Sequence, residues 1–193
     1  MKSVMKVLSA AALSVLLFSG CLTSATPPPK SWMVTASRNS NSELAVDRVA
    51  RLGSITVAAP YDRPALAVKR MDGSIAFDAY NVFASSPSAL LRAPLAALLE
   101  DYGRFGRVLP SASTARSHST LEVVVTDLSL DCREKDRRIA RVSISIAVIE
   151  NREIRKFLDG SGSADAASGD YSAAFSEAFA NAVSDALKGF KEN

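Results

Sequence analysis

The chain has 193 residues, of which 48% are hydrophobic and 22% are charged. This balance is typical of a globular protein and excludes a chain that is disordered throughout. Two cysteines and one histidine are too few for a four-ligand zinc cluster of the usual kind. We expect no metal and no cofactor.

Residues 1–20 have the pattern of a lipoprotein signal peptide. Two lysines precede Val7–Phe18, an apolar run of twelve residues, which is too short for a bilayer core that needs about twenty. Small residues then lead to Gly20-Cys21, so we predict cleavage after Gly20 and attachment of lipid to Cys21. An ordinary cleaved signal with a chance cysteine stays open. A transmembrane anchor is disfavoured, because Thr23–Pro29 follows at once and is polar and Pro-rich.

Cleavage would remove two lysines and no acids. The mature chain then carries 21 basic and 20 acidic side chains, a formal charge of +1, so it lacks the electrostatic signature of a nucleic-acid-binding protein. Leu22 follows the cysteine where an Asp would indicate retention at the inner membrane. We therefore expect the protein at the outer membrane, anchored by its lipid and facing the periplasm.

Residues 21–48 are predicted to be a lipid-anchored tether with a possible first strand at 32–35. Pro27–Pro29 favours an extended polyproline conformation, which spaces a domain away from a surface. Residues 49–193 are then predicted to form one α+β domain. Its first strand is indicated by the alternation of apolar and polar residues in Ser54–Ala59.

A hairpin is predicted around Asp72-Gly73, which separates two alternating runs. This dipeptide favours a two-residue type I′ turn, because both of its residues tolerate positive φ. That turn would place Val68 opposite Phe77 and Leu66 opposite Ala79. A helix should begin at Ser86-Pro87, and its apolar stripe is Leu91, Leu95, Leu98 and Tyr102.

After a candidate short strand at Phe105–Leu109, three strands form a predicted antiparallel meander. They begin near Leu121, Arg141 and Ile154, and a shift of the apolar phase near Thr126-Asp127 predicts a β-bulge. A flexible connection is expected from Gly160 to Gly169. The last element is a helix over Asp170–Phe190 with the stripe Tyr171, Phe175, Ala178/Phe179, Val183, Leu187 and Phe190. Together these elements predict a two-layer α+β domain, a mixed sheet with two helices on one face.

Candidate catalytic residues are sparse. His118 lies between two serines, and no G-x-S-x-G motif or orienting acid accompanies it, so we interpret it as an exposed loop histidine. Gly160-Ser161-Gly162 lacks the lysine and the third glycine of a phosphate-binding loop. We therefore expect no enzymatic activity.

Other residues admit a structural and a functional interpretation. Cys132 is either a free thiol at a strand end or half of an intermolecular disulfide. The mixed-charge segment Asp131–Arg141 is either a solvated loop or a contact for a partner protein or lipid headgroups. The apolar helix stripes either pack in the core or line a lipid groove. Trp32, the only tryptophan, is either a partner contact or part of an edge strand that packs on the core.

Several motifs occur in an order that resembles the ABC-type transport auxiliary lipoproteins. The resemblance spans nearly the whole mature chain, and Phe83 departs from it because the family has tryptophan there. The motifs are the lipobox cysteine and Pro-rich tether, Trp32-Met33-Val34, Ile55-Thr56-Val57 followed by Pro60-Tyr61-Asp62-Arg63-Pro64, Phe83-Ala84-Ser85-Ser86-Pro87, Thr120–Thr126 and Asp170-Tyr171.

The resemblance implies a non-catalytic envelope lipoprotein with a two-layer α+β fold. Such a protein accompanies a transporter that moves lipids between membranes and consists of an ATPase, a permease and an MCE-domain protein. An alternative of a different class stays open: an outer-membrane lipoprotein that activates or anchors another envelope machine, such as a peptidoglycan synthase.

Overall fold

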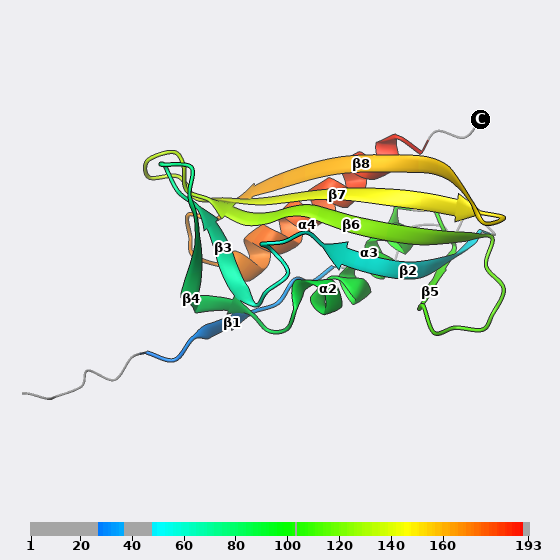
Figure 1. The fold of residues 1–193 in the computed structure, drawn as a ribbon, viewed down its shortest axis with the longest axis horizontal. Coiled ribbons are helices and arrows are strands. Elements are labelled where there is room, and N and C mark those ends of the chain that lie inside the picture. The colour runs from blue at the N-terminus through cyan, green and yellow to red at the C-terminus, as the bar shows by residue number, and fades with distance from the viewer. Residues whose placement is uncertain (1–26, 37–47, 103, 191–193) are drawn as a thin grey trace, which may run out of the picture.

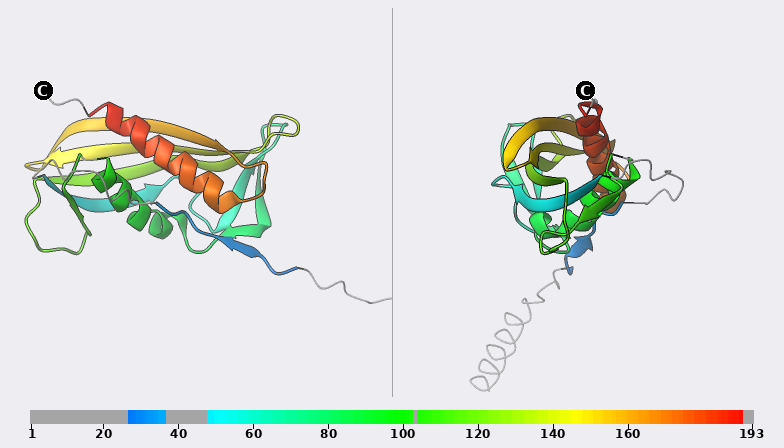
Figure 2. Two further views of the ribbon diagram at one scale, coloured as in Figure 1. Left: turned by 180° about the vertical axis from the view of Figure 1, so that it is seen from behind. Right: turned by 90° about the vertical axis from the view of Figure 1, so that its right-hand side faces the viewer.

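The structure, a computed structural model, describes residues 27–36, 48–102 and 104–190. In these residues, eight strands form one mixed sheet, and a bent helix and a long C-terminal helix cover one face of it (Figures 1 and 2). This confirms the predicted fold class. The elements are β1 (Lys30–Trp32), β2 (Val49–Val57), β3 (Ala65–Lys69), β4 (Ile75–Phe83), α2 (Pro87–Leu90), α3 (Arg92–Asp101), β5 (Arg107–Leu109), β6 (Ser119–Asp131), β7 (Ile139–Glu150), β8 (Glu153–Asp165) and α4 (Tyr171–Lys188).

Strand β6 organises the sheet. One of its edges pairs antiparallel with β7, and β7 pairs with β8. Its other edge pairs in parallel with β2 over its first half and with β3 at its last two residues. β5 then extends the sheet beyond β2, whereas β4 and β1 extend it beyond β3. The β3–β4 hairpin therefore forms one end of the elongated molecule, and the β7–β8 turn lies at the other end (Figure 1).

The predicted β-bulge is present in β6. The pairing of β6 with β7 shifts between Val125 and Asp127, so the buried positions change parity there. Along β7, buried and half-buried residues alternate from Ile139 to Ile149. Four apolar side chains of this strand are buried: Val142, Ile144, Ile146 and Val148. Both patterns follow from a sheet with one face toward the core.

The register predicted for the β3–β4 hairpin is wrong by one residue. Phe77 lies opposite Ala67, not Val68. The cause is the turn: Gly73 has φ of +81°, but Asp72 does not have positive φ, so the loop is not type I′. Instead the Asp72 side chain accepts hydrogen bonds from the Ser74 amide and hydroxyl, and the Arg70 amide donates to the Ser74 carbonyl. This is a three-residue loop that ends in a left-handed glycine.

The first helix is bent where the sequence predicted a continuous one. Ser86 is the N-cap residue as expected, but α2 ends at Leu90 and α3 begins at Arg92. Pro94 accounts for the bend, because it has no amide to donate to the Leu90 carbonyl and its ring crowds that oxygen. Leu91, Leu95 and Leu98 are buried as predicted, whereas the predicted Tyr102 is exposed.

The flexible connection predicted for residues 160–169 is wrong over its first half. Gly160 to Asp165 continues β8, and α4 lies directly on this part of the strand. A Cβ at Gly162 would lie 2.5 Å from the Ala182 amide nitrogen and 2.9 Å from the Asn181 Cβ. The two glycines and the buried alanines of α4 therefore allow helix and strand to pack backbone against backbone.

The apolar stripe of α4 forms the centre of the core. Asp170 caps the helix by accepting a hydrogen bond from the Ala173 amide at 3.0 Å, and Phe175 and Phe179 are each 1% exposed. Phe83, which departs from the family resemblance, is also buried and packs edge to face on Phe175, with ring centroids 5.3 Å apart. Apart from Tyr102, the stripes of both helices thus pack in the core, as their structural interpretation predicted.

The first strand lies at Lys30–Trp32, two residues earlier than the predicted 32–35. It pairs in parallel with the end of β4. The chain after it stays on the domain, because the Ser172 hydroxyl donates to the Met33 carbonyl and the Thr35 amide donates to the Ser176 hydroxyl. Residues 30–35, which the sequence analysis placed in the tether, are therefore part of the folded domain.

Candidate functional site

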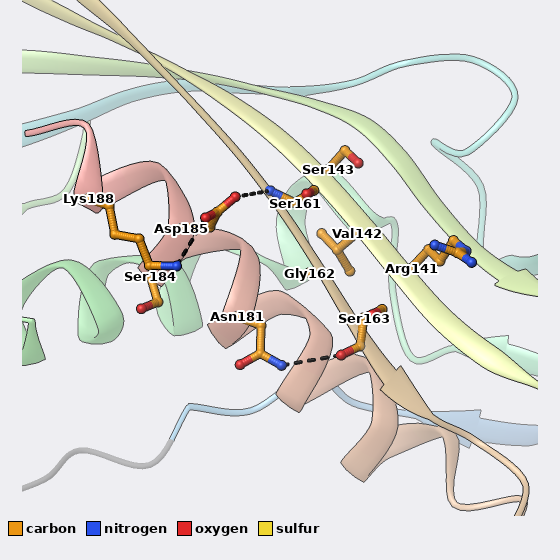
Figure 3. Close-up of a pocket in the computed structure, with 10 residues that line it drawn as sticks. All are labelled: Arg141, Val142, Ser143, Ser161, Gly162, Ser163, Asn181, Ser184, Asp185 and Lys188. Carbon is orange, nitrogen blue, oxygen red and sulfur yellow. Dashed lines mark hydrogen bonds and ion pairs between the residues drawn. The ribbon is translucent and has the colours of Figure 1, made fainter.

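A shallow groove of about 500 Å³ lies where α4 crosses the edge strand β8 (Figure 3). Its wall is mostly polar and comes from three elements. β7 supplies Arg141, Val142 and Ser143; β8 supplies Ser161, Gly162 and Ser163; α4 supplies Asn181, Ser184, Asp185 and Lys188.

The polar side chains of α4 in this groove bind the open edge of β8. The Asn181 amide donates to the Ser163 carbonyl at 3.2 Å, and the Asp185 carboxylate accepts from the Ser161 amide at 3.2 Å (Figure 3). The Ser161 amide and then Lys188 hold the pKa of Asp185 below its usual range. These side chains occupy backbone groups that an added strand would need, so they protect this stretch of the edge from pairing with another chain.

The groove offers little for catalysis. Asp185 is paired with Lys188 and with a backbone amide, and no histidine or cysteine lines the groove. Across the part of the chain that the structure describes, no three metal-ligating side chains gather. The sequence analysis missed this groove. The available signal was the pair Asn181 and Asp185, which are polar residues four apart beside a stripe of alanines.

The charged loop between β6 and β7 is organised around Asp131. This carboxylate is 6% exposed and accepts from Arg133 Nη2 at 2.7 Å and from Arg141 Nε at 2.6 Å. The bonds from Arg133 in particular hold the pKa of Asp131 far below its usual range, against the opposing effect of burial. Arg137 pairs with Glu134 at 2.5 Å. Much of the positive charge in this loop is thus neutralised within it.

Cys132 begins this loop and is half-buried. It is free in the structure, and its amide donates to the Lys69 carbonyl at 2.9 Å. Burial raises the pKa of its thiol, which lowers the thiolate fraction and therefore the reactivity of the sulfur.

His118 is exposed and extends the pairing of β2. Its Nδ1 accepts from the Val49 amide at 3.0 Å, and its own amide donates to the Val49 carbonyl at 2.8 Å. The prediction of an exposed loop histidine is confirmed. Its imidazole thus satisfies a backbone amide at the start of β2.

Trp32 is half-buried and packs against the domain. Its indole Nε1 donates to Asn81 Oδ1 at 3.1 Å, and its ring lies edge to face on Tyr171 at 5.5 Å. These contacts agree with the edge-strand interpretation of Trp32, and they join β1 to both β4 and α4. Gly20 and Cys21, the predicted cleavage and lipidation residues, lie outside the described residues.

No family model matches the chain, and no curated protein matches it. Among solved structures, protein XCC0632 from Xanthomonas campestris, of the family DUF330, is 17% identical; the match covers 86% of this chain and 94% of that one, with a TM-score of 0.64. A second crystal structure, of an uncharacterised protein, is 11% identical over 86% of this chain and all of the other, also with a TM-score of 0.64. At such identities the likeness concerns the fold.

No helix among the described residues has the length and hydropathy needed to cross a membrane.

Proposed function

We propose that this protein is a lipid-anchored, non-catalytic accessory subunit of an ABC/MCE-type system that transports lipids between membranes. In this proposal Cys21 carries the lipid in the outer membrane, and the α+β domain stands in the periplasm. An MCE-domain protein is its partner.

The observation that carries the proposal is the agreement between motif order and fold. The motifs that resemble the auxiliary lipoproteins imply a two-layer α+β domain, and the domain has that architecture. Its likeness to a DUF330 protein extends over 94% of that protein's chain. In the groove and at His118 the polar side chains pair with backbone groups of the domain, which gives them a structural role.

Genetic epistasis in the native host tests the proposal. If the protein serves an MCE transporter, its deletion should weaken the outer-membrane permeability barrier, and a double deletion with the MCE-domain gene should be no more permeable than the MCE deletion alone. A double deletion that is clearly more permeable than either single one would place the protein in another pathway.

The predicted anchor needs a separate test. Cys21→Ser should abolish incorporation of labelled fatty acid and should release the protein from the membrane or leave it uncleaved. Incorporation that persists in this variant would show that the lipid is not on Cys21.

A further inference from the structure

We propose that the β3–β4 hairpin rests on the phospholipid surface to which the chain is anchored. The inference relies on the lipid anchor of the proposed function, and it adds a second, non-covalent membrane contact made by the domain itself.

The hairpin displays an unusual amount of apolar surface. Met71, Ile75, Phe77 and Tyr80 are 71%, 38%, 39% and 50% exposed, and all four lie within ten residues of chain. Single exposed apolar side chains are normal on a protein surface, but a group of large ones on one small element marks a contact site.

Register and cation placement give this surface the chemistry of a membrane interface. Ile75 and Phe77 share one face of the hairpin, opposite Lys69 and Ala67. The Arg63 guanidinium lies over the Phe77 ring, 4.1 Å from its centre. An aromatic ring beside the stem of a basic side chain suits the boundary between acyl chains and headgroup phosphates. Arg63 forms no ion pair with a carboxylate of the described residues, so its charge is available to a phosphate.

The chain's path to the anchor brings the hairpin to the bilayer. Eight residues lie between Cys21 and Lys30, so the nine steps along the chain span about 30 Å at most. β1 then pairs with β4, the second strand of the hairpin. In Figure 1 β1 lies at this end of the molecule, beside the end of β4 and away from the hairpin turn. The lipid therefore holds the hairpin end, and not the opposite end, next to the membrane.

Trp32 joins β1 to the hairpin and to α4. Its indole donates to Asn81 and its ring packs on Tyr171, so the chain enters the domain through a strand that is packed beside β4. The occupant that this geometry favours is a phospholipid bilayer, since the bilayer is the surface that the tether keeps within reach.

A lipid-quenching experiment tests the proposal on the acylated protein. The protein is reconstituted into vesicles of phosphatidylethanolamine and phosphatidylglycerol, and a bilayer-sensitive fluorophore is attached to a single introduced cysteine in a Cys132→Ser background. The probe positions are Phe77→Cys and Met71→Cys. The matched control is Phe157→Cys, because Phe157 is 61% exposed and follows the start of β8 at Glu153 by four residues. That start lies beside the β7–β8 turn, at the opposite end of the molecule from the hairpin (Figure 1). Circular dichroism confirms that each variant is folded.

The proposal predicts that spin-labelled lipids reduce the emission of the probes at positions 71 and 77 by about two-fold or more, while the control changes little. Protein that floats with the vesicles but shows no quenching at positions 71 and 77, or equal quenching at position 157, overturns this inference and leaves the anchor intact. Protein that does not float with the vesicles overturns the anchor and this inference together.

Discussion

Replacing Gly162 with alanine should strongly destabilise the protein. Gly162 lies where β8 meets α4, and an added Cβ would be 2.5 Å from the Ala182 amide nitrogen and nearer still to the Ala178 carbonyl oxygen. Both atoms belong to the helix backbone and cannot rotate away. Since ordinary contact begins at 3.4 Å, α4 has to move outward by about 1 Å, and a gap of that size forfeits a quarter to a half of each dispersion contact it opens.

The cost follows from what α4 buries. Its stripe includes Phe175, Phe179 and Val183, all of which are fully buried, so an outward shift loosens the centre of the core. Overpacking of a core costs about 1–3 kcal/mol, and we expect about 3 kcal/mol because the obstructing atoms are backbone. In a domain of this size that corresponds to a fall in Tm of about 6–12 °C.

Urea denaturation followed by circular dichroism provides the measurement. Gly162→Ala should lower the midpoint without changing the slope, and Gly160→Ala should behave alike, because its Cβ would lie 2.8 Å from the Ala186 Cβ. Ser161→Ala is the matched control: Ser161 is an exposed neighbour in the same strand, and its change should stay within about 0.5 kcal/mol. A Gly162→Ala protein as stable as the wild type would refute the backbone packing described for β8 and α4.

Three further substitutions are predicted. Phe179→Ala should cost about 3–5 kcal/mol of unfolding free energy, because Phe179 is 1% exposed; a loss below about 1 kcal/mol would contradict its burial. Asp131→Asn should lower the free energy of unfolding by about 1–2 kcal/mol at neutral pH, because it removes the charge that pairs with Arg133 and Arg141. The loss is no larger because both arginines are exposed and solvent weakens each pair. Since the folded-state pKa of Asp131 is lowered, its contribution is present above its unfolded pKa of about 4 and is lost as the pH falls through the folded value; a wild-type advantage equal at about pH 6 and about pH 2 would contradict this. His118→Ala should leave any activity found in an esterase or amidase screen unchanged, and activity lost in this variant would identify His118 as catalytic.

The spacing of apolar residues predicted those parts of the fold in which one face of a strand or helix is buried. The phase shift at Thr126-Asp127 located the bulge, because only one parity of β6 can face the core. The stripe of α4 was predicted equally well, since its large apolar residues recur at helical spacing. In both cases the residues that form the pattern are close together in sequence, within one strand or a few helical turns.

Other features depend on partners that are distant in sequence or on a single competing bond. The register of the hairpin was set by the Asp72 side chain binding Ser74, and this bond outweighed the usual preference of Asp-Gly. The role of Gly162 depends on Ala178 and Ala182 of another element, so composition alone made the segment look flexible. The groove was missed for the same reason: Asn181 and Asp185 bind backbone groups on the open edge of β8, which is distant from them in sequence.

The central claim is that the domain works beside an MCE-domain protein. Crosslinking in cells of the native host, followed by purification of the acylated protein and mass spectrometry, tests this directly, with Cys21→Ser as the control that should lose the membrane anchor. The account predicts that an MCE-domain protein is recovered with the wild type and is depleted with Cys21→Ser. Recovery of a peptidoglycan synthase with no MCE-domain protein would contradict the account and support the alternative role.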